Sequence, residues 1–196
     1  MAKPRPIEPV IRFVAIIASD DAVRQWALRL IVRHWGDAVE VSPPLPFEAG
    51  GYYTDEMGPG LTKVMVALGE PCDPVGLADW KLATNRWEIS AMSEFSGGVI
   101  RPLNLDPGYI TQAKLVLATV KDRDHRIYLH DGIFGEITLS YVAGRWIGHR
   151  WTYPDYRTEE VFEFATRCRT RLRAHLRASG AFRTGKKNSF TETDSA

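Results

Sequence analysis

Residues 10–18, VIRFVAIIA, decide the fold, because they form an almost continuous apolar and β-branched run. Such a run is typical of a central strand that is buried on both faces of a sheet. Ser19 and Asp20 follow it and offer N-cap oxygens for a helix that continues to about residue 35. Apolar side chains recur in that helix every three or four positions, so it presents one buried stripe, and Gly36 ends it.

Working outward from this strand, strands and helices alternate along the chain. Further strands are expected at 38–41, 61–68 and 99–105. The prolines and glycines of SPPLPFEAGG exclude regular structure between the first two of these. A long helix begins at Pro74, directly after Asp73, and continues to about residue 95. The order βαββαβ is that of the ferredoxin-like split unit, which places two helices on one face of a mostly antiparallel sheet.

Three shorter stretches are assigned from local signals. Residues 52–57, YYTDEM, are interpreted as a surface loop whose aromatic side chains pack down, and a lid over a site is the alternative. Residues 106–108, Asp-Pro-Gly, predict a type II turn. Residues 111–121 predict a short helix from the spacing of their apolar side chains. A strand stays open there, because β-branched residues are frequent.

The last third of the chain predicts a β-meander followed by a helix. Strands at 126–130, 133–142 and 145–151 alternate or nearly so, and Asp-Gly and Ala-Gly pairs separate them as hairpin turns require. A final amphipathic helix is expected at 158–178. The predicted fold class is therefore α+β, with a ferredoxin-like βαββαβ core, a C-terminal β-meander extension and this final helix. The expected organisation is a flexible N-terminal lead at 1–9, a single α+β domain at 10–178 and a disordered tail at 179–196.

The composition excludes several classes of protein. A chain of 196 residues with 44% hydrophobic and 25% charged residues is typical of one ordinary globular domain. A formal net charge of +1 gives no global attraction for nucleic acid or for an anionic membrane. Cys72 and Cys168 lie far apart, which argues against a disulfide framework and a cysteine zinc site. No secretory signal or membrane-spanning run is found, so we expect a soluble, cytoplasmic protein.

Polar side chains are unusually frequent among the apolar residues of the segment 101–136. A simple core element would keep its polar positions for solvent, so we expect this segment to line a concave, net-positive site for a small anionic ligand, such as a phosphorylated metabolite or a nucleotide. Lys81, Asn85 and Glu88 form a polar stripe on the second long helix, which faces either solvent or the same cavity. The candidate ligand-binding residues are Lys81, Asn85, Glu88, Arg101, Asn104, Lys114, Lys121, Arg126 and Tyr128.

Proton transfer in this site is assigned to three further side chains. The candidate catalytic residues are His125, Asp106 and Glu136, and whether turnover occurs is left open. Glu136 points to the opposite sheet face from Ile137, so a covered Glu136 needs a cationic partner, for which Arg126 and Lys114 are available. No metal-ligand set is predicted, no cofactor is assigned, and the oligomeric state is not read from the sequence.

Other interpretations of the polar residues stay open. The final helix carries acidic residues first and arginines later, so a non-catalytic module that contacts RNA or protein through this helix and the tail is the alternative function. The helix macrodipole favours the same order of charges. The polar residues of the middle segment could also form a satisfied structural network. The run GAFRTGK at 180–186 is rejected as a phosphate-binding loop, because Lys187 replaces the required Ser or Thr.

Several long motifs resemble one bacterial family of uncharacterised domains. FVAIIASD, DPVGLADWKLATNRWE, AKLVLATVKDRDHRIYL and GIFGEITLSY are similar to the core motifs of a domain-of-unknown-function family, number 4416 in that series. The resemblance covers about residues 11–172, which is nearly the whole part expected to fold. It implies relatedness and carries no reaction with it.

Overall fold

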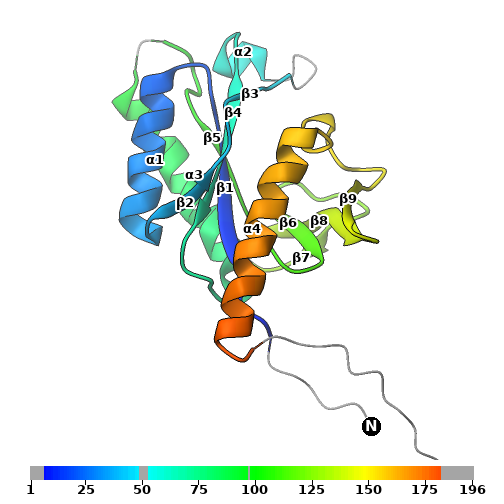
Figure 1. Ribbon diagram of the computed structural model, residues 1–196. Helices are drawn as coiled ribbons and strands as arrows, with labels where there is room; N and C mark the ends of the chain where they lie inside the picture. The colour runs from blue at the N-terminus through cyan, green and yellow to red at the C-terminus, as the bar shows by residue number, and fades with distance from the viewer. Residues whose placement is uncertain (1–6, 49–52, 97, 182–196) are drawn as a thin grey trace, which may run out of the picture.

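The computed structural model describes residues 7–48, 53–96 and 98–181 and has a mixed α/β architecture (Figure 1). These residues form four α-helices and a nine-stranded sheet in which every pairing is antiparallel. The strands are β1 (Ile11–Ala18), β2 (Ala38–Val41), β3 (Leu45–Pro46), β4 (Thr62–Leu68), β5 (Asn104–Ile110), β6 (Lys114–Thr119), β7 (Ile127–Tyr128), β8 (Phe134–Val142) and β9 (Arg145–Gly148). The helices are α1 (Asp21–Trp35), α2 (Thr54–Met57), α3 (Leu77–Glu94) and α4 (Glu159–Ala178), with 3-10 turns η1 (Pro74–Gly76) and η2 (Pro154–Tyr156).

Strand β1 lies in the middle of the sheet, as its apolar sequence predicts. The strand order is β2-β4-β1-β5-β6-β8-β7, while β3 pairs with β4 and β9 pairs with β8. Successive side chains of β1 enter opposite cores, as the alternation of a strand requires. Val14 and Ile16 pack toward α1 and α3, whereas Phe13 and Ala15 pack toward α4. Figure 1 shows α1 and α3 on one side of the sheet and α4 on the other.

The boundaries of the long helices follow their capping signals. Asp20 Oδ1 accepts the N–H of Ala22 at 2.7 Å, and Gly36 ends α1 with φ +93°. Asp73 accepts the N–H of Val75 and starts the turn η1 that leads into α3. The three strands predicted for the meander are found in shorter form as β7, β8 and β9, but β7 and β9 both pair with the edge of β8 opposite β6, so they do not form a simple meander. The predicted last helix is confirmed as α4. The prediction of a disordered tail falls mostly on residues 182–196, which lie outside the described residues.

The predicted turn at 106–108 is wrong, because these residues continue β5 alongside β1. Asp106, Pro107 and Gly108 pair with Ala15, Val14 and Phe13 in turn. Proline is tolerated there since pairing with β6 begins only at Gly108, so the neighbouring edge of β5 is still open. A Cβ on Gly108 would lie 2.3 Å from the carbonyl oxygen of Val116 and 2.8 Å from the Phe13 ring. Glycine therefore serves close packing here and not a turn.

The predicted helix at 111–121 is also wrong, and the strand left open in its place is β6. Residues 115–118 are all buried, which is typical of a strand covered on both faces. The hairpin between β5 and β6 closes through Thr111, whose Oγ1 accepts the backbone N–H groups of Ala113 and Lys114 at 3.0 and 2.9 Å. A short apolar run is compatible with both the helical and the strand periodicity, and here pairing with β5 and β8 stabilises the strand.

Three smaller differences concern the segments around β4. Residues 45 and 46 form the short strand β3 despite the prolines, because Leu45 is buried and pairs with Lys63. Residues 54–57 form the single-turn helix α2 instead of a loop. The fourth predicted strand begins at Asn104, later than expected. No helix in the described ranges is long and apolar enough to cross a membrane.

Candidate functional site

Five polar side chains of α3, β5 and the segment before β5 form a closed ring, which we call the β5–α3 network. Its members are Lys81, Glu88, Arg101, Asn104 and Asp106. Lys81 Nζ lies 3.7 Å from Glu88 Oε1 and 3.4 Å from Asp106 Oδ1. Arg101 Nη2 donates to Glu88 Oε2 at 2.8 Å and also to Asn104 Oδ1. Asn104 Nδ2 donates to Asp106 Oδ2 at 2.9 Å and closes the ring.

This network takes the place of a neighbouring strand at the start of β5. The Leu105 carbonyl oxygen accepts Lys81 Nζ at 2.7 Å, and the Leu105 N–H donates to Glu88 Oε1 at 2.9 Å. Buried backbone groups need partners, so two side chains of α3 satisfy the edge of β5 that β6 has not yet reached. Lys81 and Glu88 are seven residues apart and therefore lie on one face of α3. This arrangement explains why a lysine is buried on a helix.

Glu136 of β8 is the centre of a second group, which we call the Glu136 cluster. It comprises Glu136, Arg126, His125 and Thr138. Glu136 Oε2 accepts Arg126 Nε at 2.7 Å and lies 3.1 Å from His125 Nε2, while Oε1 accepts the Thr138 hydroxyl at 3.3 Å. Glu136 is buried and Ile137 is exposed, so the predicted alternation is confirmed, and Arg126 is the cationic partner.

Contacts at both ring nitrogens and a stacked Trp151 fix the His125 imidazole. Its Nδ1 lies 3.2 Å from Asp124 Oδ1, and its ring stacks on Trp151 with centroids 4.9 Å apart. His149 also stacks on Trp151, with ring centroids 4.8 Å apart. The imidazole is therefore fixed behind Glu136, where it orients the carboxylate.

A third group lies on β4 and η2, and none of the predicted site residues belongs to it. Lys63 is fully buried, and its Nζ donates to Asp155 Oδ2 at 2.7 Å and to the Asp155 carbonyl oxygen at 3.1 Å. The ammonium also lies 3.9 Å from the centre of the Tyr156 ring. Burial lowers the pKa of Lys63, and the Asp155 carboxylate opposes that shift. The Tyr156 hydroxyl is buried and has no hydrogen-bond partner within the described part of the chain.

These three groups meet at one cavity of about 530 Å³, which we call the β5–β8 cavity. It lies on the face of the sheet that α4 covers, beyond the start of that helix, where Lys63, Asp106 and Glu136 replace the apolar side chains of the core. Residues after β3, before α2 and in η2 complete its wall. The lining residues are Phe47, Glu48, Tyr53, Asp106, Leu117, Ala118, Thr119, Lys121, Arg123, Arg126, Glu136, Tyr153, Pro154, Asp155 and Tyr156.

The charges of the cavity differ from the net-positive lining that the sequence suggested. Four carboxylates and three cationic side chains line it. Three of the carboxylates have a cation against them, because Asp106 faces Lys81, Glu136 faces Arg126 and Asp155 faces Lys63. Burial raises the pKa of the Tyr156 phenol well above its ordinary value, and the carboxylates nearby add to the shift. The part of the lining that these pairs form is therefore close to neutral, and the exposed charges of the lining are those of Lys121, Arg123 and Glu48.

The structure brings some of the sequence-predicted residues to the cavity and separates others from it. Asp106, Lys121, Arg126 and Glu136 line it directly. Lys81, Glu88, Arg101 and Asn104 lie behind Asp106 in the β5–α3 network, with Asn85 half-buried on the same helix, and His125 lies behind Glu136.

Two predicted ligand-binding residues lie elsewhere. Lys114 begins β6 and Lys121 lies two residues beyond its end, so the length of the strand, about 17 Å from Lys114 to Thr119, separates the two lysines. The helix predicted at 111–121 would have placed the two lysines on one face, seven residues apart, and the strand β6 does not. Tyr128 is exposed on β7 at the edge of the sheet, where it packs on Phe134.

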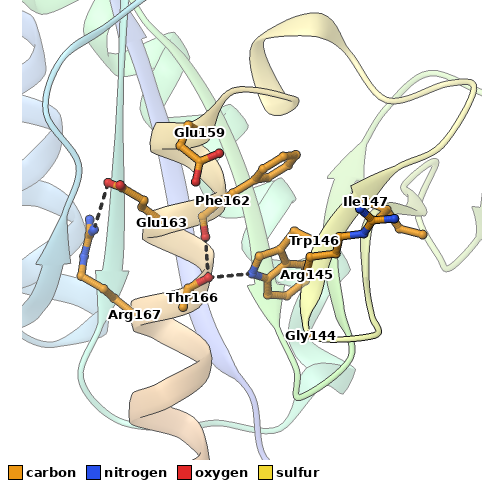
Figure 2. A pocket seen from close by; sticks show the side chains of 9 residues that line it. All are labelled: Gly144, Arg145, Trp146, Ile147, Glu159, Phe162, Glu163, Thr166 and Arg167. Atoms are coloured by element: carbon orange, nitrogen blue, oxygen red, sulfur yellow. Dashed lines mark hydrogen bonds and ion pairs between the residues drawn. The ribbon is translucent and has the colours of Figure 1, made fainter.

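A second, more open cavity of about 660 Å³ lies between α4 and β9 (Figure 2). Trp146 Nε1 donates to Thr166 Oγ1 at 3.2 Å across it, and Glu163 pairs with Arg167 at 4.0 Å along the helix. None of the sequence-predicted site residues lines this groove. No group of three or more His, Cys, Asp or Glu side chains with metal-binding geometry occurs among the residues that the structure describes. The β5–β8 cavity is therefore the candidate site.

One protein family matches this chain, and the match spans the elements that build the site. The model of the family described as Domain of unknown function (DUF4416) matches residues 8–172. The chain belongs to this family. The matched region contains β1 to β9 and most of α4, so all lining residues of the β5–β8 cavity fall within the family domain. Searches of curated proteins and of solved structures found no match.

Proposed function

We propose that the β5–β8 cavity binds a small anionic molecule, such as a phosphorylated metabolite or a nucleotide. The observation that carries the proposal is Tyr156, which lines this cavity and whose buried hydroxyl has no hydrogen-bond partner among the described residues. A buried polar group without a partner costs about 1–3 kcal/mol of stability. A ligand that supplies the missing hydrogen bond would remove this cost, so the hydroxyl is suited to binding.

The charge pattern supports an anion at the outer part of the cavity. The carboxylates of Asp155, Asp106 and Glu136 are each paired with a cation of the protein. Lys121 and Arg123 line the cavity from exposed positions, and Arg123 Nη1 donates to the Asp122 carbonyl oxygen. Arg126 donates to Glu136, to the Lys121 carbonyl oxygen and to the Tyr153 hydroxyl. A guanidinium has five N–H groups, so two remain for a phosphate or carboxylate.

The volume and the aromatic wall suit a ligand larger than an inorganic ion. Cavities that bind small molecules usually measure about 300–1,000 Å³, and this one lies in that range. Phe47 and Tyr53 pack on each other at 5.8 Å and provide an apolar surface beside the charged groups.

In this proposal Glu136 orients Arg126 toward the ligand and does not take a proton from it. Its carboxylate already accepts Arg126 and Thr138 and lies against His125 Nε2, so most of its acceptor positions are used. His125 then acts through Glu136, and Asp106, which keeps part of its carboxylate at the cavity, is the polar group that meets the ligand.

Thermal unfolding with a panel of nucleotides, sugar phosphates and inorganic phosphate tests the proposal. A ligand at ten times its Kd adds about 1.4 kcal/mol of stability, which raises the Tm of a chain of this size by about 3–6 °C. Lys121→Ala combined with Arg123→Ala should abolish this shift, whereas Lys114→Ala, at the far end of β6, should leave it unchanged. The proposal fails when no anion raises the Tm of the wild-type protein or when the double variant responds as the wild type does.

The arginines of α4 do not favour the alternative of an RNA-binding or protein-binding helix. Arg167 and Arg171 both contact Glu40 of β2, at 3.2 and 3.3 Å. Arg169 Nε donates to the Gln112 carbonyl oxygen at 2.6 Å, and Arg173 Nη1 donates to the Gln112 side chain at 2.7 Å. These cations are used inside the protein, where they attach α4 to the sheet.

The arrangement of β1, α1, β2, β4, α3 and β5 supports the ferredoxin-like core that we predict from the sequence. The strands β2, β4, β1 and β5 are neighbours in this order, and α1 and α3 lie on one face. In this interpretation β6 to β9 extend the core at β5, and the cavity lies where the extension meets it.

A further inference from the structure

The deep wall of the β5–β8 cavity has its own chemistry, distinct from that of the cationic rim. Three side chains from two elements define it: Asp106 of β5, and Asp155 and Tyr156 of η2. Asp106 Oδ1 lies 3.4 Å from Lys81 Nζ, and its Oδ2 accepts Asn104. Asp155 Oδ2 accepts Lys63. A carboxylate has about four acceptor positions, so both aspartates keep acceptor capacity.

The deep wall favours neutral hydrogen-bond donors over a second charged group. The cations Lys63 and Lys81 lie directly behind the two aspartates, so a positively charged ligand group would find the carboxylates already compensated. A phosphate there would find no uncompensated cation either, because both lysines are paired with the aspartates. Burial raises the pKa of Tyr156, so its hydroxyl stays protonated and can both donate and accept. A ligand hydroxyl, which also donates and accepts, matches both kinds of partner.

We infer that the deep wall binds the hydroxyl groups of a polyhydroxylated ligand, so that the anion is a sugar phosphate, either free or as the ribose phosphate of a nucleotide. This inference rests on the proposed function, in which the exposed Lys121 and Arg123, together with the more buried Arg126, hold the phosphate. The sugar then extends inward, with its hydroxyls on Asp106, Asp155 and Tyr156 and its C–H groups toward Leu117.

Isothermal titration calorimetry with three phosphate monoesters tests the inference. The probes are ribose 5-phosphate, AMP and tetrahydrofurfuryl phosphate, which keeps the five-membered ring and the phosphate of ribose 5-phosphate but has no hydroxyl. Loss of the hydrogen bonds to the deep wall should weaken the hydroxyl-free probe about tenfold or more relative to ribose 5-phosphate. Tighter binding of ribose 5-phosphate than of AMP indicates a free sugar phosphate as the ligand, and the reverse order indicates a nucleotide.

Tyr156→Phe removes only the hydroxyl and is the matched variant. Because that hydroxyl has no partner among the described residues, the variant should unfold at the same or a higher temperature without ligand. It should also bind ribose 5-phosphate several-fold more weakly while its affinity for the hydroxyl-free probe stays unchanged. Asp155→Asn provides a second variant with the same expected change in binding, but it removes the charge partner of the buried Lys63 and should therefore lower the Tm without ligand.

The two possible failures are distinguishable. Equal affinity of the wild type for ribose 5-phosphate and for the hydroxyl-free probe overturns this inference. If both probes bind equally and their binding still requires Lys121 and Arg123, the proposed anion-binding function stands and only the inference about the sugar hydroxyls fails. Binding of none of the three phosphates overturns both.

Discussion

Gly108→Ala is the substitution that most directly tests the path of β5. The structure carries the chain straight through residues 106–108, with Gly108 against Phe13 on one side and against β6 on the other. A Cβ at this position would lie 2.3 Å from the Val116 carbonyl oxygen and 2.8 Å from two ring atoms of Phe13, both inside the 3.0 Å that real Cβ contacts respect. The carbonyl belongs to the backbone of β6, so no rotamer change relieves the clash.

The expected cost follows from this contact. Overpacking a core usually costs about 1–3 kcal/mol, and a clash with the backbone belongs at the upper end, about 3 kcal/mol. For a chain of this size that corresponds to a fall in Tm of about 6–12 °C. Urea unfolding at equilibrium measures the change in free energy, and differential scanning calorimetry measures the Tm. Gly98→Ala is the control, because a Cβ there meets no atom within 4 Å.

Gly108→Asn separates the strand from the turn that the sequence suggested. In a type II turn the glycine has a positive φ, and asparagine is the next best residue at that position. In β5 the larger asparagine side chain should be at least as destabilising as alanine. The strand is refuted when Gly108→Ala unfolds within about 0.5 kcal/mol of wild type, or when Gly108→Asn is clearly more stable than Gly108→Ala.

Three more predictions concern buried polar groups. Arg126→Met and Glu136→Leu should each cost about 3 kcal/mol or more, because each leaves a buried charge unpaired, while the double variant should cost much less than the sum; additive costs in urea unfolding would contradict this. Burial raises the pKa of the Cys168 thiol, so above pH 9 the unfolded state binds fewer protons than the folded state and stability falls by up to about 1.4 kcal/mol per pH unit. Cys168→Ala should flatten this dependence in urea unfolding between pH 8 and 10, and an unchanged slope would show that the thiol is not responsible. Thr111→Ala should cost about 1 kcal/mol by calorimetry, because it removes the hydroxyl that closes the hairpin between β5 and β6, and a cost near zero would show that the turn holds without it.

The sequence predicts an element well where its apolar residues fit only one periodicity and a capping residue marks the boundary. The run 10–18 and the helix after Asp20 satisfy both conditions, and β1 and α1 are found as expected. The apolar run at 111–121 is compatible with both a helix and a strand, and pairing with β5 and β8 determines that it is a strand. The glycine of residue 108 could serve a turn or a close contact, and the contact depends on Phe13, which is distant in the chain.

The candidate site is predicted only where one strand carries its own polar residues. Asp106 and Glu136 interrupt apolar strands, so their sequence neighbours reveal them. Lys63 offers a similar signal, because it shares the alternating positions of the buried Met65 and Ala67 in β4, and the sequence analysis did not use it. Tyr156 carries no such signal, since its burial depends on how η2 packs over distant strands. Contacts between segments far apart in the chain decide the rest.

The position of α4 in the chain has a consequence for synthesis on the ribosome. One face of β1, which includes Phe13, is covered by side chains of α4 such as Phe164 and Leu172. The ribosome synthesises these residues some 150 positions after Phe13. Until α4 has left the exit tunnel, the nascent sheet exposes this apolar face, which is the kind of surface that chaperones hold and that aggregates when unprotected. A reading frame interrupted before Glu159 should therefore yield insoluble product, even though the cavity residues are all encoded upstream of that position.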